Sequence, residues 1–390
     1  MLVTTYAFLG LLVLFLALLL QTGLKLRQAI VYEEELLKTS SILRWPSVAL
    51  IVPVGGNDPR IRASLTSLIR QDYPSFTLIL VTATSHEPAA TLIQELKREY
   101  PRIWHVVAGP ALNCGQKNHN LLRGVAAIER SKPDCYVFCD STHLAKPNFL
   151  QLLIQPIARG STRISTGYHE VAVQDGTLTS LAYAISVLFM RLLQAIAVFT
   201  QPWGGAMAFT RETFVKAEIA KMWANTVVDD CTLVAYLQKK HIPVELAAGA
   251  VVTTNVERYP KDTWEAWLER QILFPRFCAP LQWWLLGVMT LLLLTPPFIA
   301  LEDFVLSLEQ GLSPRVLLPI GFILVPAVLI ASLRIFLPQK TNPLKFLAAF
   351  LLALGTFLKV YLGTFGVNHI LWQNKVYKVG RGGVVLEVLE

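Results

Sequence analysis

The sequence carries little charge for its length. Of its 390 residues, 16% are charged and 53% are hydrophobic, whereas a typical soluble domain has about a quarter of its residues charged. Charge is missing altogether from four stretches, at residues 2–20, 281–301, 316–333 and 346–358. Each is long enough, or nearly so, to cross a bilayer core as a helix. We therefore expect an integral membrane protein with an N-terminal anchor (1–24), C-terminal spans within 281–367 and a tail (368–390).

Cysteine is also scarce, and its spacing excludes the common metal and disulfide frameworks. The five cysteines form no Cys-x-x-Cys pair, which favours reduced thiols in a cytosolic domain. Cys135, Cys139 and His143 are four residues apart, but in a strand and its loop they do not share a face, so a zinc site is disfavoured. No basic stripe interleaved with aromatic residues appears, and we expect no nucleic-acid partner.

The first apolar segment lacks the features of a cleaved signal peptide. It has no basic start and no small-residue cleavage site, and Lys25 and Arg27 follow it. Positive charge after the span places the middle of the chain in the cytoplasm. Four tryptophans close to the first C-terminal span predict an interfacial aromatic belt: Trp264, Trp267, Trp283 and Trp284. The segment 344–367 leaves two possibilities open, a full crossing or a re-entrant helix.

Residues 45–280 read as one α/β domain. A continuous apolar run at Val48–Val54 predicts a buried strand, further strands are predicted at Thr77–Val81 and Arg102–Val107, and these segments alternate with segments of helical periodicity. This alternation is typical of a parallel sheet with right-handed crossovers. We expect a nucleotide-binding half at 45–145 and an acceptor half at 146–280.

Asp140 stands where the apolar run from Cys135 to Cys139 ends. Ligands of α/β domains bind at the carboxyl ends of parallel strands, and a carboxylate there is a candidate ligand for Mg²⁺ or Mn²⁺ carrying phosphate oxygens. The alternative is an N-cap for the helix that Pro147 begins.

Lys117 precedes an apolar helix predicted from Leu121 to Ile128. An ammonium near a helix N-terminus is well placed for a diphosphate, because the helix dipole attracts the same anion. A solvated loop lysine is the alternative reading.

Two features of the second half are candidates for the acceptor side. The mostly apolar stretch 179–200 contains Arg191 and Gln194 and is expected to lie at the membrane interface rather than to cross it. The glycine pair in the run from Trp203 to Met207 allows close approach of a ligand to the backbone.

Asp229 and Asp230 are adjacent acids at the start of an apolar helix predicted from Thr232 to Lys239. Because neighbouring carboxylates repel, one of the pair is expected to have a shifted pKa, which is a usual condition for a catalytic base. The plainer alternative is the general preference of helix N-termini for negative charge.

These motifs, in this order, resemble the family 2 glycosyltransferases, most closely the ceramide glucosyltransferase branch that includes hopanoid-associated bacterial enzymes. The resemblance covers residues 45–280 and the arrangement of one anchor before and several spans after. It implies a GT-A fold that binds a nucleotide sugar, such as a UDP-sugar, with a divalent metal, and a hexose transferred with inversion to a lipid acceptor.

The resemblance also implies roles for individual residues. Asp140 corresponds to the metal-binding motif and Asp230, with Asp229 beside it, to the catalytic base. The residues it implies for donor binding are Pro53, Glu87, Lys117, Asn118, Asn120, Asp140, Arg270 and Arg276, and those for the acceptor side are Trp203, Gly204, Gly205 and Met207.

Two motifs depart from the family pattern. Glu87 is the only carboxylate in the loop where the family has its first aspartate, and Arg270 and Arg276 stand in place of an Arg-x-x-Arg-Trp element. A degenerate membrane protein with a binding or regulatory role is therefore the main alternative, since a fold does not guarantee chemistry. A processive polysaccharide synthase is a further one, disfavoured by the small number of spans.

Overall fold

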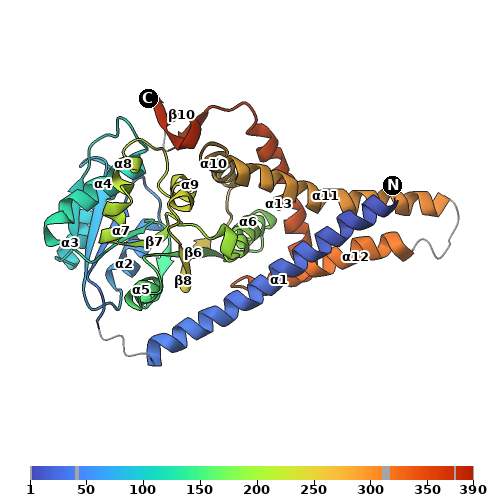
Figure 1. Ribbon diagram of the computed structural model, residues 1–390, viewed down its shortest axis with the longest axis horizontal. Coiled ribbons are helices and arrows are strands. Elements are labelled where there is room, and N and C mark those ends of the chain that lie inside the picture. The colour runs from blue at the N-terminus through green and yellow to red at the C-terminus, as the bar shows by residue number, and fades with distance from the viewer. Residues whose placement is uncertain (1, 40–43, 310–316, 373–374, 390) are drawn as a thin grey trace.

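The computed structural model describes residues 2–39, 44–309, 317–372 and 375–389. An α/β domain lies at one end, and a rod of long helices extends away from it (Figure 1). The apolar residues at the two ends of the sequence thus come together in one part of the molecule.

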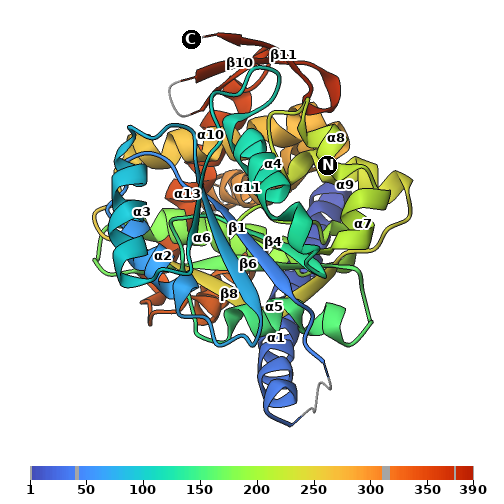
Figure 2. The ribbon, with the colours of Figure 1, turned by 90° about the vertical axis from the view of Figure 1, so that its left-hand side faces the viewer.

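Eight strands form a single mixed sheet, which runs through the middle of the domain (Figure 2). The strands are β1 (Val48–Pro53), β2 (Phe76–Thr82), β3 (Trp104–Val107), β4 (Cys135–Cys139), β5 (Leu144–Ala145), β6 (Ile164–Val173), β7 (Ala206–Thr210) and β8 (Glu245–Val256). Their order is β3-β2-β1-β4-β7-β6-β8-β5. The first four strands are parallel, and β7 is antiparallel to β4. The mixed α/β class is confirmed, and the two expected halves share one sheet.

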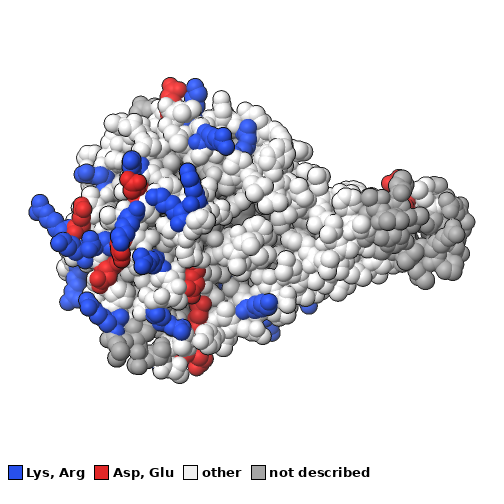
Figure 3. Space-filling view, viewed as in Figure 1, with Lys and Arg blue, Asp and Glu red and all other residues white. Residues whose placement is uncertain are grey.

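Four helices are long and apolar enough to cross a membrane: α1 (Leu2–Thr39), α11 (Pro280–Glu309), α12 (Leu317–Ser332) and α13 (Pro343–Gly363). Large apolar side chains such as Leu14, Val288 and Phe298 are exposed on them. In the space-filling view the charged residues gather on the α/β domain, and the rod is nearly bare of charge (Figure 3). Exposure of such an apolar surface to water is unfavourable, and the surface is suited to the hydrocarbon core of a bilayer.

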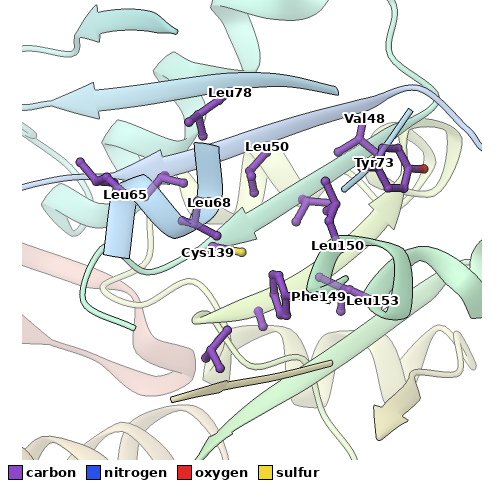
Figure 4. Packing of buried hydrophobic residues seen from close by; sticks show 14 of the residues in the cluster. Val48, Leu50, Leu65, Leu68, Tyr73, Leu78, Cys139, Phe149, Leu150 and Leu153 are labelled. Atoms are coloured by element: carbon purple, nitrogen blue, oxygen red, sulfur yellow. The ribbon is translucent and has the colours of Figure 1, made fainter. Parts of the chain in front are cut away.

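Helices cover both faces of the sheet, and successive strand residues point to opposite faces. The covering helices are α2 (Ile61–Ile69), α3 (Pro88–Glu99), α4 (Gln116–Ile128), α5 (Phe149–Ala158), α7 (Arg211–Lys216), α8 (Ile219–Trp223) and α9 (Cys231–Lys239). Leu50 of β1 packs with α2, α3 and α5, as Figure 4 shows for Leu65, Leu68 and Phe149. Its neighbour Ile51 belongs to the core on the other face. Burial on both faces explains why β1 reads as a continuous apolar run.

The helix expected at the membrane interface, α6 (Leu178–Gln194), is mostly covered by protein. It shares one core with β6, α1 and α13, including Val171, Leu188 and Phe350. Its apolar residues are therefore buried in the molecule, and its place near the membrane interface stays a prediction.

The C-terminal tail forms a small antiparallel sheet of β9 (His369–Trp372), β10 (Lys375–Val379) and β11 (Val385–Leu389). This sheet packs against α10 (Lys261–Cys278) and the loop before α9. The Val227 amide donates to the Gly383 carbonyl at 2.9 Å, and the Gln116 amide donates to the Tyr377 hydroxyl at 3.3 Å. The tail thus belongs to the α/β domain and holds the chain on either side of the candidate site.

Candidate active site

The candidate site lies where β4 ends and where α4 and α9 begin. Asp140 follows β4, Lys117 lies in the first turn of α4, and Asp229 and Asp230 precede α9. Pairing of β4 with β7 places the loop before β7 beside Asp140, whose amide approaches the Gly205 carbonyl at 3.4 Å. Residues far apart in the sequence therefore form one cluster, as the position of strand ends predicts.

Lys117 connects the acids of this cluster. Its Nζ lies 2.8 Å from Asp140 Oδ1 and 3.0 Å from Asp229 Oδ2, and it donates to the Gly204 carbonyl at 3.2 Å. Burial alone would lower the pKa of Lys117, but the surrounding carboxylates raise it above its ordinary value. The helix begins at Gln116 rather than at Leu121, and the solvated-lysine reading is wrong.

Asp140 is held as an anion. Burial would raise its pKa, but the Lys117 ammonium, together with His143, brings the pKa well below the ordinary value. It does not cap the next helix, because α5 begins at Phe149 after Asn148. The N-cap alternative is therefore wrong.

Asp229 is completely buried. Its Oδ1 has no hydrogen-bond partner among the described residues, and its Oδ2 makes an ion pair with Lys117 without hydrogen-bond alignment. Burial, together with the nearby Asp230 and Asp140, raises the pKa of Asp229 to about 7 despite the attraction of Lys117. One acid of the adjacent pair is thus strongly perturbed, as its position beside a second carboxylate predicts.

This shift predicts a pH dependence of stability. The folded state holds the Asp229 proton up to about pH 7, whereas the unfolded state releases it near pH 4. Stability from this group is fully present below pH 4 and is lost as the pH rises towards 7. Between pH 5 and pH 8 we expect the wild type to lose about 3 kcal/mol relative to Asp229→Asn. Thermal unfolding of both proteins in detergent measures the difference; equal pH profiles would contradict the assignment.

Asp230 has a different environment from its neighbour. Its Oδ2 accepts from the Gly204 amide at 2.9 Å and its Oδ1 from the Cys231 amide at 2.6 Å. It caps α9, as the plainer reading of the pair predicts, and it also lines a mostly apolar cavity. Two backbone amides therefore fix the orientation of this carboxylate in the cavity wall.

The loop from Trp203 to Met207 shapes the site. A Cβ at Gly204 would lie 2.3 Å from Asp229 Oδ2 and 2.7 Å from Lys117 Nζ, so only glycine permits the cluster to close. The Trp203 ring stacks on His169 with a centroid distance of 4.9 Å. Met207 points into the core and is fully buried, so its position does not support an acceptor contact.

The other predicted donor residues lie around this cluster with partners of their own. Asn118 donates to the Thr226 carbonyl at 2.9 Å, and Asn120 accepts from Gln116 at 2.9 Å. Arg276 donates to the Val367 carbonyl and lies over the Trp283 ring. Pro53 ends β1, Glu87 precedes α3 and accepts from the Thr84 amide, and Arg270 lies in α10 near Tyr259. A direct donor contact at these residues stays a prediction.

The cavity beside Asp230 has a volume of about 260 Å³ and a mostly apolar wall. Trp203 and Asp230 lie in the wall on the side of the acid cluster. Most of the remaining wall comes from α1, α6, α10, α11 and α13, through residues such as Phe15, Phe189, Leu268, Leu286 and Phe357. Helices of the rod and of the domain thus enclose one apolar chamber next to the acids.

The donor set suits a divalent cation that also binds a diphosphate. No group of three or more candidate ligands occurs among the described residues, but Mg²⁺ sites at phosphates use only one or two protein carboxylates. Asp140 keeps Oδ2 clear of Lys117, and Asp229 Oδ1 is buried without a hydrogen-bond partner in the described part of the chain. Asp140 is therefore suited to hold the ion.

Comparison with known proteins identifies the class. The family model described as glycosyl transferase family 21 matches residues 7–385, nearly the whole chain. The chain belongs to glycosyl transferase family 21. The expectation of a glycosyltransferase is confirmed, under family 21 rather than family 2.

Solved structures of glycosyltransferases are also similar. The mannosyltransferase PcManGT from Pyrobaculum calidifontis, in complex with GDP-Man and Mn²⁺, is 16% identical, with 88% of this chain and 99% of that chain covered and a TM-score of 0.48. Glucosyl-3-phosphoglycerate synthase from Mycobacterium tuberculosis, with Mn²⁺, UDP-glucose and glycerol 3-phosphate, is 18% identical, with 59% and 78% covered and a TM-score of 0.35.

Proposed function

We propose that this glycosyltransferase moves a hexose, such as glucose, from a UDP-sugar to the hydroxyl of a membrane lipid. Ceramide-, diacylglycerol- and hopanoid-like lipids are the acceptor classes that the sequence resemblance implies. The observation that carries the proposal is the apolar cavity with Asp230 in its wall. A lipid tail fits such a chamber, and its headgroup then meets the acid cluster.

The donor diphosphate lies at Lys117 in this proposal. The ammonium is fixed between Asp140 and Asp229 in the first turn of α4, where the helix dipole also attracts an anion. Mg²⁺ or Mn²⁺ bound at Asp140 supplies further positive charge for the departing diphosphate. The Lys117 ammonium stabilises the negative charge that develops on the departing diphosphate.

Asp230 acts as the general base. Its carboxylate is oriented by the Gly204 and Cys231 amides and lines the cavity, so it can accept the proton of a lipid hydroxyl held there. The hydroxyl oxygen attacks the anomeric carbon as the bond to the diphosphate breaks. A single displacement of this kind inverts the anomeric centre.

We propose that the α/β domain lies in the cytoplasm. Lys25 and Arg27 after the first span favour this orientation. We propose that α13 lies along the cytoplasmic surface instead of crossing, because the chain on both sides of it contacts that domain. Gln339 before α13 accepts from the Val173 amide, and the tail after it pairs with Val227.

Transfer assays test the proposal. Detergent-purified full-length protein is incubated with a panel of radiolabelled UDP-sugars, extracted lipids and Mg²⁺ or Mn²⁺. The proposal predicts lipid-dependent label in the organic phase as a discrete glycolipid. Donor binding with no transfer would favour the degenerate alternative, and a water-soluble labelled polymer would favour a polysaccharide synthase.

A cavity-filling substitution tests the acceptor chamber. Ser186 lines the cavity, and its hydroxyl bonds to the carbonyl four residues earlier in α6. We expect Ser186→Phe to lower kcat/KM for the lipid by about tenfold or more, roughly the effect of 1.4 kcal/mol, with donor binding unchanged. Ser332→Phe is the matched control, since Ser332 makes the same backbone bond in α12 outside the cavity. Equal activities of the two variants would place the acceptor elsewhere.

A further inference from the structure

His143 lies at the edge of the acid cluster with one ring nitrogen anchored. Its Nδ1 is 2.7 Å from the Thr254 hydroxyl, and its Nε2 is 3.8 Å from Asp140 Oδ2. The second distance is too long for a hydrogen bond. The side chain is 11% exposed, so the ring is held in place with its free nitrogen facing a carboxylate that it does not touch.

The two oxygens of Asp140 are used differently. Oδ1 pairs with Lys117 at 2.8 Å, whereas Oδ2 is the oxygen nearest to His143. With bonds of about 2.1 Å, one metal ion can join two donor atoms up to about 4.2 Å apart, so a separation of 3.8 Å is within its reach. The space between Asp140 Oδ2 and His143 Nε2 thus lies on the side of Asp140 that does not contact Lys117.

The hydrogen bonds behind His143 are compatible with the tautomer that this role needs. Thr254 is buried, and its hydroxyl also lies 3.1 Å from His169 Nδ1. One hydroxyl donates only one hydrogen bond, so at most one of the two imidazoles accepts from Thr254 and at least one donates to it. When His169 accepts, His143 carries its proton on Nδ1 and leaves Nε2 free. Metal-bound histidines commonly have such an anchored second nitrogen.

We infer that His143 binds the divalent cation through Nε2 as the second protein ligand beside Asp140, with Thr254 fixing the orientation of the ring. This inference rests on the proposed function, which places the cation at Asp140. A nitrogen ligand also favours a transition metal over Mg²⁺, whose sites are made of oxygen. We therefore expect Mn²⁺ to bind more tightly than Mg²⁺.

Pulsed electron paramagnetic resonance of Mn²⁺ tests this directly. Full-length protein in detergent is loaded with Mn²⁺ and UDP, and the echo envelope is examined for ¹⁴N modulation from a bound imidazole. We expect the modulation in the wild type, its loss in His143→Gln, and a Kd for Mn²⁺ raised about tenfold or more in that variant. His105→Gln is the matched control and is expected to keep the modulation, because both ring nitrogens of His105 already have partners, Thr82 and Gln94.

The outcomes separate this inference from the proposed function. Mn²⁺ bound without ¹⁴N modulation, or with unchanged affinity in His143→Gln, overturns the role of His143 and leaves the metal at Asp140. Failure of the wild type to bind Mn²⁺ overturns both the role of His143 and the placing of the metal at Asp140. Should His143→Gln fail to fold, His143→Asp supplies an oxygen ligand in its place. We expect His143→Asp to bind Mn²⁺ without the ¹⁴N modulation. We also expect the difference between its affinities for Mn²⁺ and Mg²⁺ to be smaller than in the wild type.

Discussion

Asp230→Asn is expected to lower the rate of sugar transfer by at least about a hundredfold, the usual contribution of a general base. The amide has nearly the shape of the carboxylate, and its oxygen can still accept one of the two backbone hydrogen bonds from Gly204 and Cys231. It cannot take up the proton of the acceptor hydroxyl. Binding of the UDP-sugar should be unchanged, because Lys117 and Asp140 are untouched. Radiolabel transfer and equilibrium donor binding measure the two effects.

Asp175→Asn is a suitable control for this variant. Asp175 accepts a hydrogen bond from the Thr177 hydroxyl just before α6, and it takes no part in the acid cluster. Transfer by this control should stay close to that of the wild type. Normal turnover by Asp230→Asn would show that another group, or solvent, removes the proton.

Lys117→Met should cause the largest loss of stability. The substitution leaves Asp140 and Asp229 close together without the cation that both contact. Removing one partner of a buried ion pair typically costs about 3–5 kcal/mol. We expect a clear fall in the thermal unfolding temperature in detergent and no detectable binding of the UDP-sugar.

The double variant Lys117→Met/Asp229→Asn separates these two consequences. It removes one negative charge along with the positive one, and we expect it to recover much of the lost stability. Donor binding should not return, since the ammonium itself holds the diphosphate. A single variant as stable as the wild type would show that Lys117 does not balance the acids, and recovered donor binding would remove it from the donor site.

Strand ends and apolar runs made much of the molecule predictable. The strand before Asp140 has a continuous apolar run because both of its faces are buried, and this placed the acid at a carboxyl edge where α/β domains bind ligands. The apolar segments that form the rod were equally plain. Residue types alone also marked Asp229 and Asp230 as a pair in which one acid is perturbed.

The sequence could not show which groups meet across long separations. Lys117 lies between Asp140 and Asp229 only because the sheet order brings α4 and α9 to one edge. The position of His143 depends on Thr254, which is more than one hundred residues away in β8. No local pattern carries such information, since each residue on its own resembles an ordinary loop or strand residue.

Some apolar and aromatic residues that the sequence assigned to the membrane interface are buried by protein instead. Four tryptophans were expected in an interfacial belt, but Trp264 and Trp283 are buried and Trp267 is half-buried; of the four, only Trp284 is largely exposed, at 57%. The apolar helix α6 is likewise packed in a protein core. Hydrophobicity predicts burial but does not tell whether a membrane or a protein core provides it.

The anomeric configuration of the product tests the central claim most directly, because a base and a leaving diphosphate on opposite sides of the sugar permit only inversion. The glycolipid made from whichever α-linked UDP-sugar supports transfer is isolated, and the coupling constant of its anomeric proton is measured by nuclear magnetic resonance. We expect a β-linked sugar, and we expect Asp230→Asn to slow its formation by at least about a hundredfold. An α-linked product would contradict a single displacement with Asp230 as the base.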